Sequence, residues 1–209
     1  VLQDFPEARA FWWPRFLRIA RWFIAWEAGR RAEATALHAE VSANLPIAIG
    51  TRTFALRTRA DRIEQRRDGS YAILDYKTGQ PPTGKQVRMG LSPQLTLEAA
   101  ILREGGFEGI DAGSSVGELV YVRLSGNNPP GEQRSLELKI RNNDTPQRPD
   151  EAADYAREQL EILIRKFENE NEAYTSLNLS MWSNRYGSYD DLARIKEWSA
   201  AGGLGIEEW

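Results

Sequence analysis

Residues 61–79, DRIEQRRDGSYAILDYKTG, place two runs of mixed apolar and polar residues on either side of Asp68-Gly69. An Asp-Gly pair between two such runs predicts a β-hairpin, because glycine adopts the left-handed backbone that a tight turn needs. Asp75 and Lys77 lie two residues apart on the second run, so both side chains leave the same face, about 7 Å apart along the backbone. A carboxylate and an ammonium on an inward face are costly unless they neutralise each other or take part in chemistry. The stretch therefore holds either a structural salt bridge or a site.

The register of this hairpin decides whether Asp61 joins Asp75 and Lys77. A two-residue loop would place Asp61 opposite Tyr76 and turn its side chain to the other face. A three-residue loop with a left-handed Gly69, or a bulge, would instead place Asp61 across from Lys77 and diagonal to Asp75. We predict this second register, in which two carboxylates and the backbone carbonyl of Tyr76 converge on one hard cation. Lys77 then lies beside the cation, where it can hold or deprotonate an attacking water.

The composition is that of a folded protein without thiol chemistry. The chain has 209 residues, of which 41% are hydrophobic, and this is enough to close a packed core. It has no cysteine, which excludes disulfides, thiolate zinc sites and cysteine-ligated iron-sulfur clusters. No stretch approaches the roughly 20 apolar residues of a bilayer span, and the N-terminus lacks an export pattern. We expect a soluble, cytoplasmic protein, and the start at Val1 indicates a piece of a larger polypeptide.

Charge is unevenly distributed along the chain, although the net charge is only -3. Residues 51–90 hold nine Lys or Arg against four acids, whereas residues 150–173 are acidic. A basic strip around carboxylates suits a phosphate-bearing polymer, which the strip attracts while the acids hold a cation against it. A solvated sheet edge rich in arginine explains the strip equally well when it is taken alone. The candidate phosphate contacts are Arg57, Arg59, Arg62 and Arg88.

The remaining pattern predicts one α/β domain flanked by helices. Strands are expected at 35–41, 54–64, 71–76, 117–125 and 134–140. A helix is expected from about Pro6 to Ala32, with its aromatic residues packed in the core rather than forming a nucleic-acid-binding stripe. Ser92 is expected to cap a second helix that ends on Gly105-Gly106, and Pro149 to open a third that runs to about Glu172.

The order of Asp61, then Asp75-Tyr76-Lys77-Thr78-Gly79, then Gln94 on a following helix resembles the PD-(D/E)xK nuclease core, specifically its RecB-like branch. D-x-K alone is a weak motif, and the spaced aspartate, the hairpin and the Gln helix make it more specific. Residues 14–27, PRFLRIARWFIAWE, and 189–198, YDDLARIKEW, further resemble the C-terminal nuclease domain of AddB. AddB is a subunit of a helicase-nuclease that processes broken DNA ends. The resemblance spans nearly the whole chain and is to the alphaproteobacterial type without an iron-sulfur cluster.

The resemblance implies a role for each matching position. The implied metal ligands are Asp61, Asp75, the carbonyl of Tyr76 and Glu40, which matches an early acidic motif of the family. The implied catalytic residues are Asp61, Asp75, Lys77 and Gln94, and Gln94 would support the site and contact the strand being cut. The four arginines above would then bind DNA. The family usually has a tyrosine four residues after the glutamine, but here this position is Glu98, on the same helical face as Gln94.

The resemblance also implies a fold and a function. We expect a restriction-endonuclease-like core with a central mixed β-sheet flanked by helices, formed by residues 1–209 as a single domain with a partly frayed tail at 196–209. The expected activity is exonucleolytic hydrolysis of single-stranded DNA in repair of DNA ends, with one or two Mg²⁺ ions, Mn²⁺ as a substitute and no iron-sulfur cluster. The expected partner is an AddA-like helicase-nuclease subunit, and no membrane is involved. An inactive DNA-holding or subunit-docking module of the same fold is the alternative.

Overall fold

The computed structural model describes residues 6–139 and 145–173, so the tail predicted at 196–209 lies outside the described residues. The chain divides into two units, Val1–Arg165 and Lys166–Trp209, and the sheet described below belongs to the first. In the described ranges, no helix is long and apolar enough to cross a membrane.

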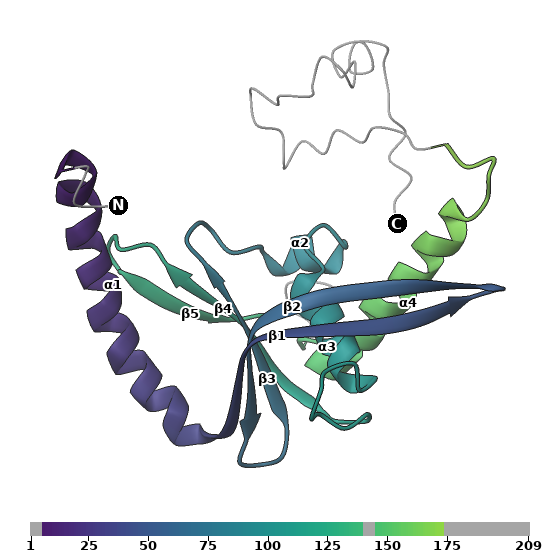
Figure 1. Ribbon diagram of the computed structural model, residues 1–209, viewed down its shortest axis with the longest axis horizontal. Coiled ribbons are helices and arrows are strands. Elements are labelled where there is room, and N and C mark those ends of the chain that lie inside the picture. Colours follow the sequence, from purple (N-terminus) through teal and green to yellow (C-terminus); the bar gives the residue numbers. More distant parts are fainter. Residues whose placement is uncertain (1–5, 140–144, 174–209) are drawn as a thin grey trace, which may run out of the picture. The chain divides into compact units, whose positions relative to one another are not determined.

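A five-stranded mixed β-sheet with the strand order β1-β2-β3-β4-β5 forms the centre of the first unit (Figure 1). The strands are β1 (Ala34–Ile49), β2 (Arg52–Arg66), β3 (Tyr71–Lys77), β4 (Val116–Leu124) and β5 (Gly131–Ser135). Neighbouring strands are antiparallel except β3 and β4, which are parallel and are connected through the short helix α2 (Gly84–Arg88) and the helix α3 (Gln94–Arg103). The predicted α/β class is confirmed. The strand predicted at 35–41 is shorter than the observed β1, and the strand predicted at 134–140 lies later in the chain than the observed β5.

The turn between β2 and β3 has the predicted three-residue loop. Gly69 has a φ of 84°, its N–H donates to the Arg66 carbonyl at 3.0 Å, and the Arg66 N–H donates to the Ser70 carbonyl at 2.8 Å. The Asp68 carboxylate accepts from both the N–H and the hydroxyl of Ser70, at 2.9 and 2.7 Å, which stabilises the turn locally. The sequence Asp-Gly-Ser thus specifies this loop.

The register that follows from this loop differs from the prediction. Arg62 pairs with Leu74, so the next position in the register places Asp61 opposite Asp75. The predicted pairing of Asp61 with Lys77 is wrong, because the loop comprises residues 67–69 and not 68–70, which shifts the register by two residues. The two aspartates nevertheless share one face, and they are direct neighbours across the strands rather than diagonal ones.

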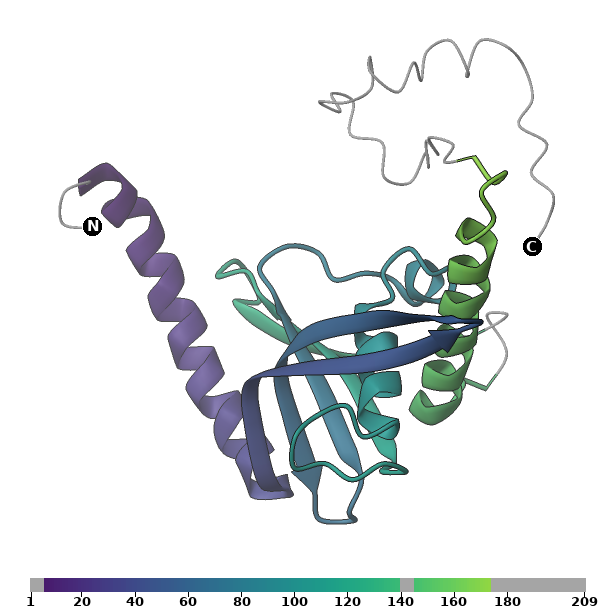
Figure 2. The ribbon, with the colours of Figure 1, turned by 45° about the vertical axis from the view of Figure 1, so that its right-hand side comes forward.

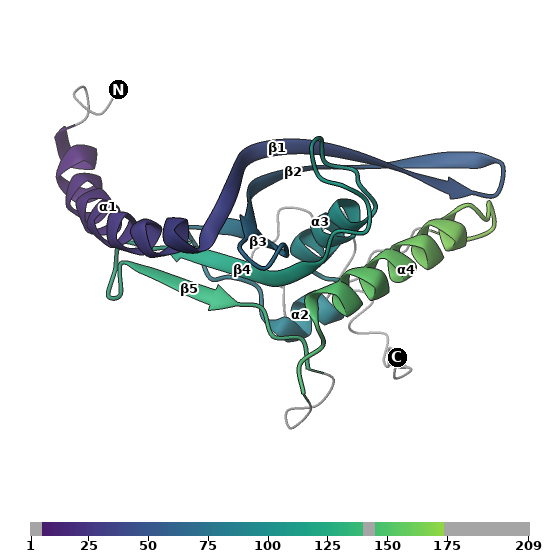
Figure 3. The same ribbon diagram turned by 90° about the horizontal axis from the view of Figure 1, so that it is seen from below.

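The hairpin of β1 and β2 bends where the side-chain alternation shifts by one residue. Ala60 and Ile63 are both fully buried in the same core although they are three residues apart on β2. Across the pair on β1, Glu40 has a φ of 55°, which is uncommon for a residue with a side chain. Figure 3 shows the consequence, since beyond the bend the two strands arch over α3.

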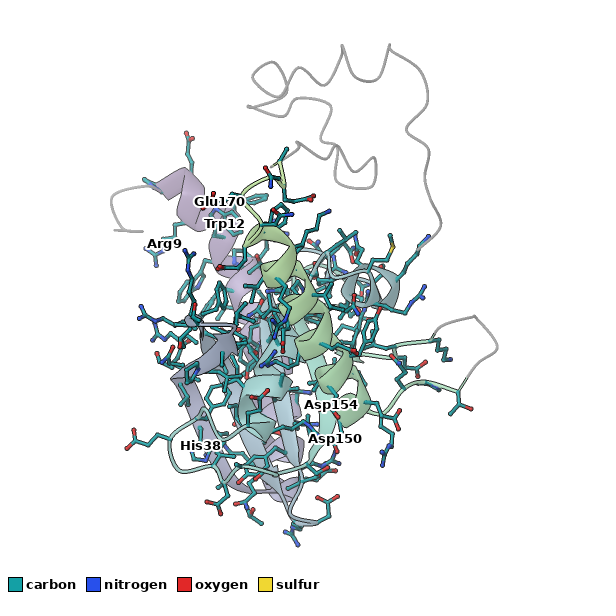
Figure 4. The ribbon with its side chains drawn as sticks, turned by 90° about the vertical axis from the view of Figure 1, so that its right-hand side faces the viewer. Arg9, Trp12, His38, Asp150, Asp154 and Glu170 are labelled. Atoms are coloured by element: carbon teal, nitrogen blue, oxygen red, sulfur yellow. The ribbon has the colours of Figure 1, made fainter. Side chains whose placement is uncertain are left out.

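Helices cover both faces of the sheet. On one face, α3 and α4 (Pro149–Phe167) share a core with residues such as Ile63, Ile73 and Leu95. The start of α4 is tied to α3 by ion pairs of Arg103 with Asp150 and Asp154, at 2.6 and 3.1 Å, and Figure 4 labels the two aspartates. Helix α3 begins at Gln94 after Pro93, which provides no side-chain cap, so the predicted Ser92 cap is wrong.

The other face is covered by the helix α1 (Pro6–Glu33), as Figure 2 shows from a second angle. Trp22 and Trp26 pack on a small apolar cluster that includes Leu74 and Val120, residues that alternate with those facing α3. A side chain at Gly131 on β5 would lie 2.1 Å from the Trp22 ring, so glycine there permits the close approach. The predicted extent of α1 is confirmed.

The first half of α1 does not pack in the core, which corrects our prediction for its aromatic residues. Phe11, Trp12 and Phe16 are each more than half exposed, and Trp12 projects from the helix in Figure 4. Basic side chains of this half contact the loop between β4 and β5: Arg15 donates to the Ser125 carbonyl and Arg18 to that of Gly126. The helix runs past the edge of the sheet. The aromatic side chains that recur along it therefore pack on the sheet in its second half and are exposed in its first half.

Because Gly69 needs a left-handed backbone, we predict that Gly69→Ala lowers the free energy of unfolding by about 1–2 kcal/mol. Gly29→Ala is the matched control, since Gly29 lies in α1 with open space around it, and this change should raise stability by about 0.5–1 kcal/mol. Urea unfolding of both variants measures the two effects. Equal effects of the same sign would contradict the three-residue loop.

Candidate active site

Asp75, Lys77 and Gln94 meet where β3 ends and α3 begins. Asp75 is 1% exposed, and the Lys77 Nζ lies 2.9 Å from its Oδ1 and 2.8 Å from its Oδ2. The same ammonium donates to the Gln94 Oε1 at 3.2 Å. Asp75 and Lys77 leave one face of β3 because they are two residues apart, and α3 packs on that face. The predicted grouping of these three residues is found in the structure.

Asp61 is fixed beside this group by the backbone of the neighbouring strand. Its Oδ2 accepts a hydrogen bond from the Tyr76 N–H at 2.9 Å. The pKa of Asp75 is raised above its ordinary value, mainly because the carboxyl is buried, and the Asp61 charge adds to this effect while Lys77 opposes it. Two neighbouring carboxylates therefore carry more negative charge than Lys77 offsets.

Glu98 is a third acid in the site and is buried like Asp75, and the sequence pattern indicated it only as a departure from the family. It is 1% exposed, and its Oε1 accepts from the Thr58 hydroxyl at 2.9 Å and from the Gln94 Nε2 at 3.3 Å. Its Oε2 has no hydrogen-bond partner within the described part of the chain. Burial, followed by the charges of Asp75 and Asp61, raises the pKa of Glu98 to about 7 despite these hydrogen bonds.

Tyr121 forms a wall of the site that sequence reasoning missed. It is the residue of β4 that pairs with Asp75 of β3, it is 2% exposed, and its hydroxyl has no hydrogen-bond partner among the described residues. Burial raises the pKa of Tyr121, and the charges of Asp75 and Glu98 contribute further. The parallel pairing that brings it here joins strands far apart in sequence, so no local signal could have identified it.

Two predicted site residues are paired with other side chains in the structure. Glu40, predicted as a metal ligand, is exposed at the bend of β1 and its carboxylate pairs with Arg59 at 2.9 Å. Arg62, predicted as a DNA contact, is 4% exposed, and its guanidinium pairs with Glu27 and Glu64 beneath α1. Arg62 thus belongs to an internal ion-pair network, since it pairs with Leu74 on the face of the sheet that α1 covers.

The other arginines proposed as DNA contacts differ in exposure. Arg57 is exposed on the outer half of β2, and Arg59 is exposed but paired with Glu40. Arg88 is half-buried on α2. DNA contact by these three side chains stays a prediction.

The site's chemistry fits a hard divalent cation through its oxygen donors. Among the residues that the structure describes, no group of three or more acids or histidines has the arrangement of a metal site. Two carboxylates, Asp61 and Asp75, do come together beside the Tyr76 backbone, and oxygen is the donor that Mg²⁺ prefers. Burial, with a smaller contribution from the Asp61 charge, raises the pKa of Asp75, and a bound cation would favour the charged carboxylate.

Glu98→Gln should change the pH dependence of stability in metal-free buffer. The pKa of Glu98 is about 7 in the folded protein against an ordinary 4.5, so the folded state binds the extra proton between these values and stability rises as pH falls. The variant removes the buried charge. We therefore predict that at pH 8 it is more stable than the wild type by about 2–3 kcal/mol, and that the difference disappears near pH 4.5.

Chemical unfolding of both proteins across this pH range measures the difference. Glu161→Gln is a control of opposite sign, because hydrogen bonds from Arg165 and Arg157 hold the pKa of this exposed carboxyl below its usual value. An E98Q protein that is less stable than the wild type at pH 8 would contradict the buried charge.

Curated proteins from Rickettsia, each described only as an uncharacterized protein, are similar to part of the chain. The chain is 34% identical over 96 residues to a protein of Rickettsia bellii and 34% identical over 99 residues to one of Rickettsia typhi. These segments are 46% and 47% of this chain but 12% of each relative, so the chain spans only a small part of their length. The crystal structure of SSO0001 aligns over 77% of this chain and 61% of that chain at 14% identity, with a TM-score of 0.38. That similarity is too weak to bear on the fold.

A match to a family model assigns the chain to a family, which the names of these relatives do not. The model of the PD-(D/E)XK nuclease superfamily matches residues 2–178, a range that includes the whole sheet and the group around Asp75. The mixed sheet flanked by helices is consistent with the restriction-endonuclease-like fold of this superfamily. Because the match covers most of its length, the chain belongs to the PD-(D/E)XK nuclease superfamily.

Proposed function

We propose that this chain is a Mg²⁺-dependent nuclease that hydrolyses phosphodiester bonds in single-stranded DNA. The observation that supports this most is the meeting of Asp61, Asp75, Lys77 and Gln94 at the end of β3. Superfamily members generally use Mg²⁺ or other divalent metals. A structural salt bridge alone would need only Asp75 and Lys77, whereas Asp61 adds a second negative charge that destabilises the pair.

In this proposal Asp61 and Asp75 hold the cation, together with the Tyr76 carbonyl. The Tyr76 N–H fixes the Asp61 carboxylate, so one ligand is oriented before the cation binds. When bound, a divalent ion polarises a phosphoryl oxygen and lowers the pKa of a water. Burial of Asp75 excludes bulk water from one side of the site and strengthens each electrostatic interaction there.

Lys77 acts on the reacting groups directly. Its side chain is 33% exposed, so the ammonium is within reach of a bound strand although Asp75 and Gln94 hold it in place. An ammonium has three N–H donors, and a donor not used by these partners can hold the attacking water or a phosphate oxygen. The positive charge then offsets the charge that develops on the phosphoryl group in the transition state.

The wider role that we propose is that of the nuclease domain of an AddAB-type helicase-exonuclease in recombinational repair of DNA ends. Its partner would be an AddA-like helicase-nuclease subunit that feeds it single strands. Two things support this: the AddB-like sequence at 14–27, which forms part of α1, and the much greater length of the Rickettsia relatives. The similar stretch at 189–198 lies outside the described residues.

Asp75→Asn and Lys77→Met test the assignment on labelled single-stranded DNA with Mg²⁺. We predict that each variant lowers kcat by about 10²–10³-fold, because each removes a group that stabilises the transition state. Binding of the DNA, measured in Ca²⁺ or without metal, should change little. Asp68→Asn is the matched control from the same hairpin, since Asp68 only stabilises the turn.

The substrate form discriminates between the finer proposals. An exonuclease should degrade linear but not circular single strands, should work with Mn²⁺ in place of Mg²⁺ and should stop on addition of EDTA. Cutting of circular DNA would contradict the exonuclease assignment while keeping the nuclease. DNA binding without cutting by the wild type would favour the inactive DNA-holding module.

A further inference from the structure

The direction of the Gln94 amide decides whether it helps or opposes Lys77. A glutamine side chain has an acceptor oxygen at one end and two N–H donors at the other. In the structure the oxygen faces the Lys77 Nζ at 3.2 Å. If the amide were reversed, its NH₂ group would face the ammonium, and two donors would repel each other. Lys77 would then lose one of the two groups that hold it.

Glu98 provides the hydrogen bond that fixes this direction, and Asp75, whose raised pKa is partly offset by a hydrogen bond from Gln94, is a further acceptor near the same NH₂ group. The Gln94 Nε2 donates to the Glu98 Oε1 at 3.3 Å, and the two residues lie one helical turn apart on α3. The Glu98 Oε1 acts as an acceptor, so the NH₂ end of Gln94, which carries the donors, must face it. Glu98 is itself held, because it is 1% exposed and accepts from the Thr58 hydroxyl at 2.9 Å.

We propose that Glu98 is a positioning residue of the nuclease site, which acts through Gln94 by holding its amide oxygen toward Lys77. The chain of contacts runs from Thr58 on the arched part of β2, through Glu98 and Gln94 on α3, to Lys77 and Asp75 on β3. Three elements that are separate in sequence thereby set the direction of one ammonium. This inference rests on the proposed function and assigns a residue that the family pattern leaves out.

The role requires an acceptor oxygen at position 98 and does not require a negative charge. The pKa of Glu98 near 7 is in line with this, since burial disfavours the charged form of the side chain. A metal ligand would have the opposite requirement, because a carboxylate binds a hard cation through its charge. Glutamine retains the acceptor oxygen without the charge, and leucine removes both at similar size. The two substitutions therefore separate the two roles.

The experiment compares Glu98→Gln and Glu98→Leu in the nuclease assay, with kcat, KM and the Mg²⁺ concentration for half-maximal rate measured for each. We expect E98Q to stay within about threefold of the wild type and E98L to lower kcat by about 10–100-fold, as misplacement of a reacting group does. The Mg²⁺ requirement should change little in both. Glu108→Leu, at an exposed position, controls for the loss of a surface acid.

A double-mutant cycle shows whether Glu98 acts through Gln94. In a Gln94→Leu background, E98L should cause almost no further loss, because residues that act as a unit are not additive. Additive losses would overturn the inference. It would also be overturned if E98Q were as damaging as E98L and raised the Mg²⁺ requirement, which would make Glu98 a metal ligand.

A measurement that needs no activity separates this inference from the proposed function. If the wild type does not cut DNA, the proposed function fails, and the Gln94 amide is then followed by NMR. The side-chain NH₂ of Gln94 should exchange with solvent at similar rates in the wild type and E98Q and about tenfold faster in E98L, since its acceptor is lost. Equal rates in all three proteins would overturn the positioning role.

Discussion

Two carboxylates held opposite each other on neighbouring strands are the constraint on which the site depends. Asp61 accepts from the backbone N–H of Tyr76, the residue next to Asp75, and Asp75 is almost completely buried. Burial raises the pKa of Asp75, and the neighbouring charge of Asp61 adds to this effect. Lys77 and the Tyr76 N–H offset part of this cost. The remaining negative charge is what makes the place suitable for a divalent cation.

The bend of the β1–β2 hairpin links the fold to this site. The shift in alternation between Ala60 and Ile63 lets β2 pair with β3 on one side of the bend and cover α3 on the other. Thr58 reaches Glu98 only because of that arch. Behind the sheet, Arg62 lies between Glu27 of α1 and Glu64 of β2, a buried pairing that would be costly to break by removing one partner. The helix α1 thus braces the strand that carries Asp61.

Local signals in the sequence predicted the elements well and the long-range contacts poorly. The Asp68-Gly69 turn and the extent of α1 follow from nearest-neighbour chemistry, so they could be read directly. The exposure of Phe11 and Phe16 depends on where the sheet ends beneath α1. The helical spacing of apolar residues in the sequence does not indicate that position. The fold class needed only the order of helices and strands, and that order was evident.

In the candidate site, too, residues placed by local geometry could be predicted and residues placed by long-range contacts could not. Asp75 and Lys77 share a face by strand geometry alone, and Gln94 follows them on the next long helix, so the sequence was sufficient to group them. The surroundings of Glu40 depend on the bend and those of Arg62 on the packing of α1, two tertiary features with no local signal. Tyr121 arrives through a parallel pairing between distant strands, which is set by the packing of α3 and not by any short motif.

The central claim is that Asp61 and Asp75 jointly hold a divalent cation. Anomalous diffraction from crystals soaked in Mn²⁺ tests it most directly, with crystals of Asp61→Asn soaked in parallel. The account predicts an anomalous peak between the carboxylates of residues 61 and 75 in the wild type, which is lost in the variant. A peak that persists in the variant, or one located at Glu40 instead, would contradict the account.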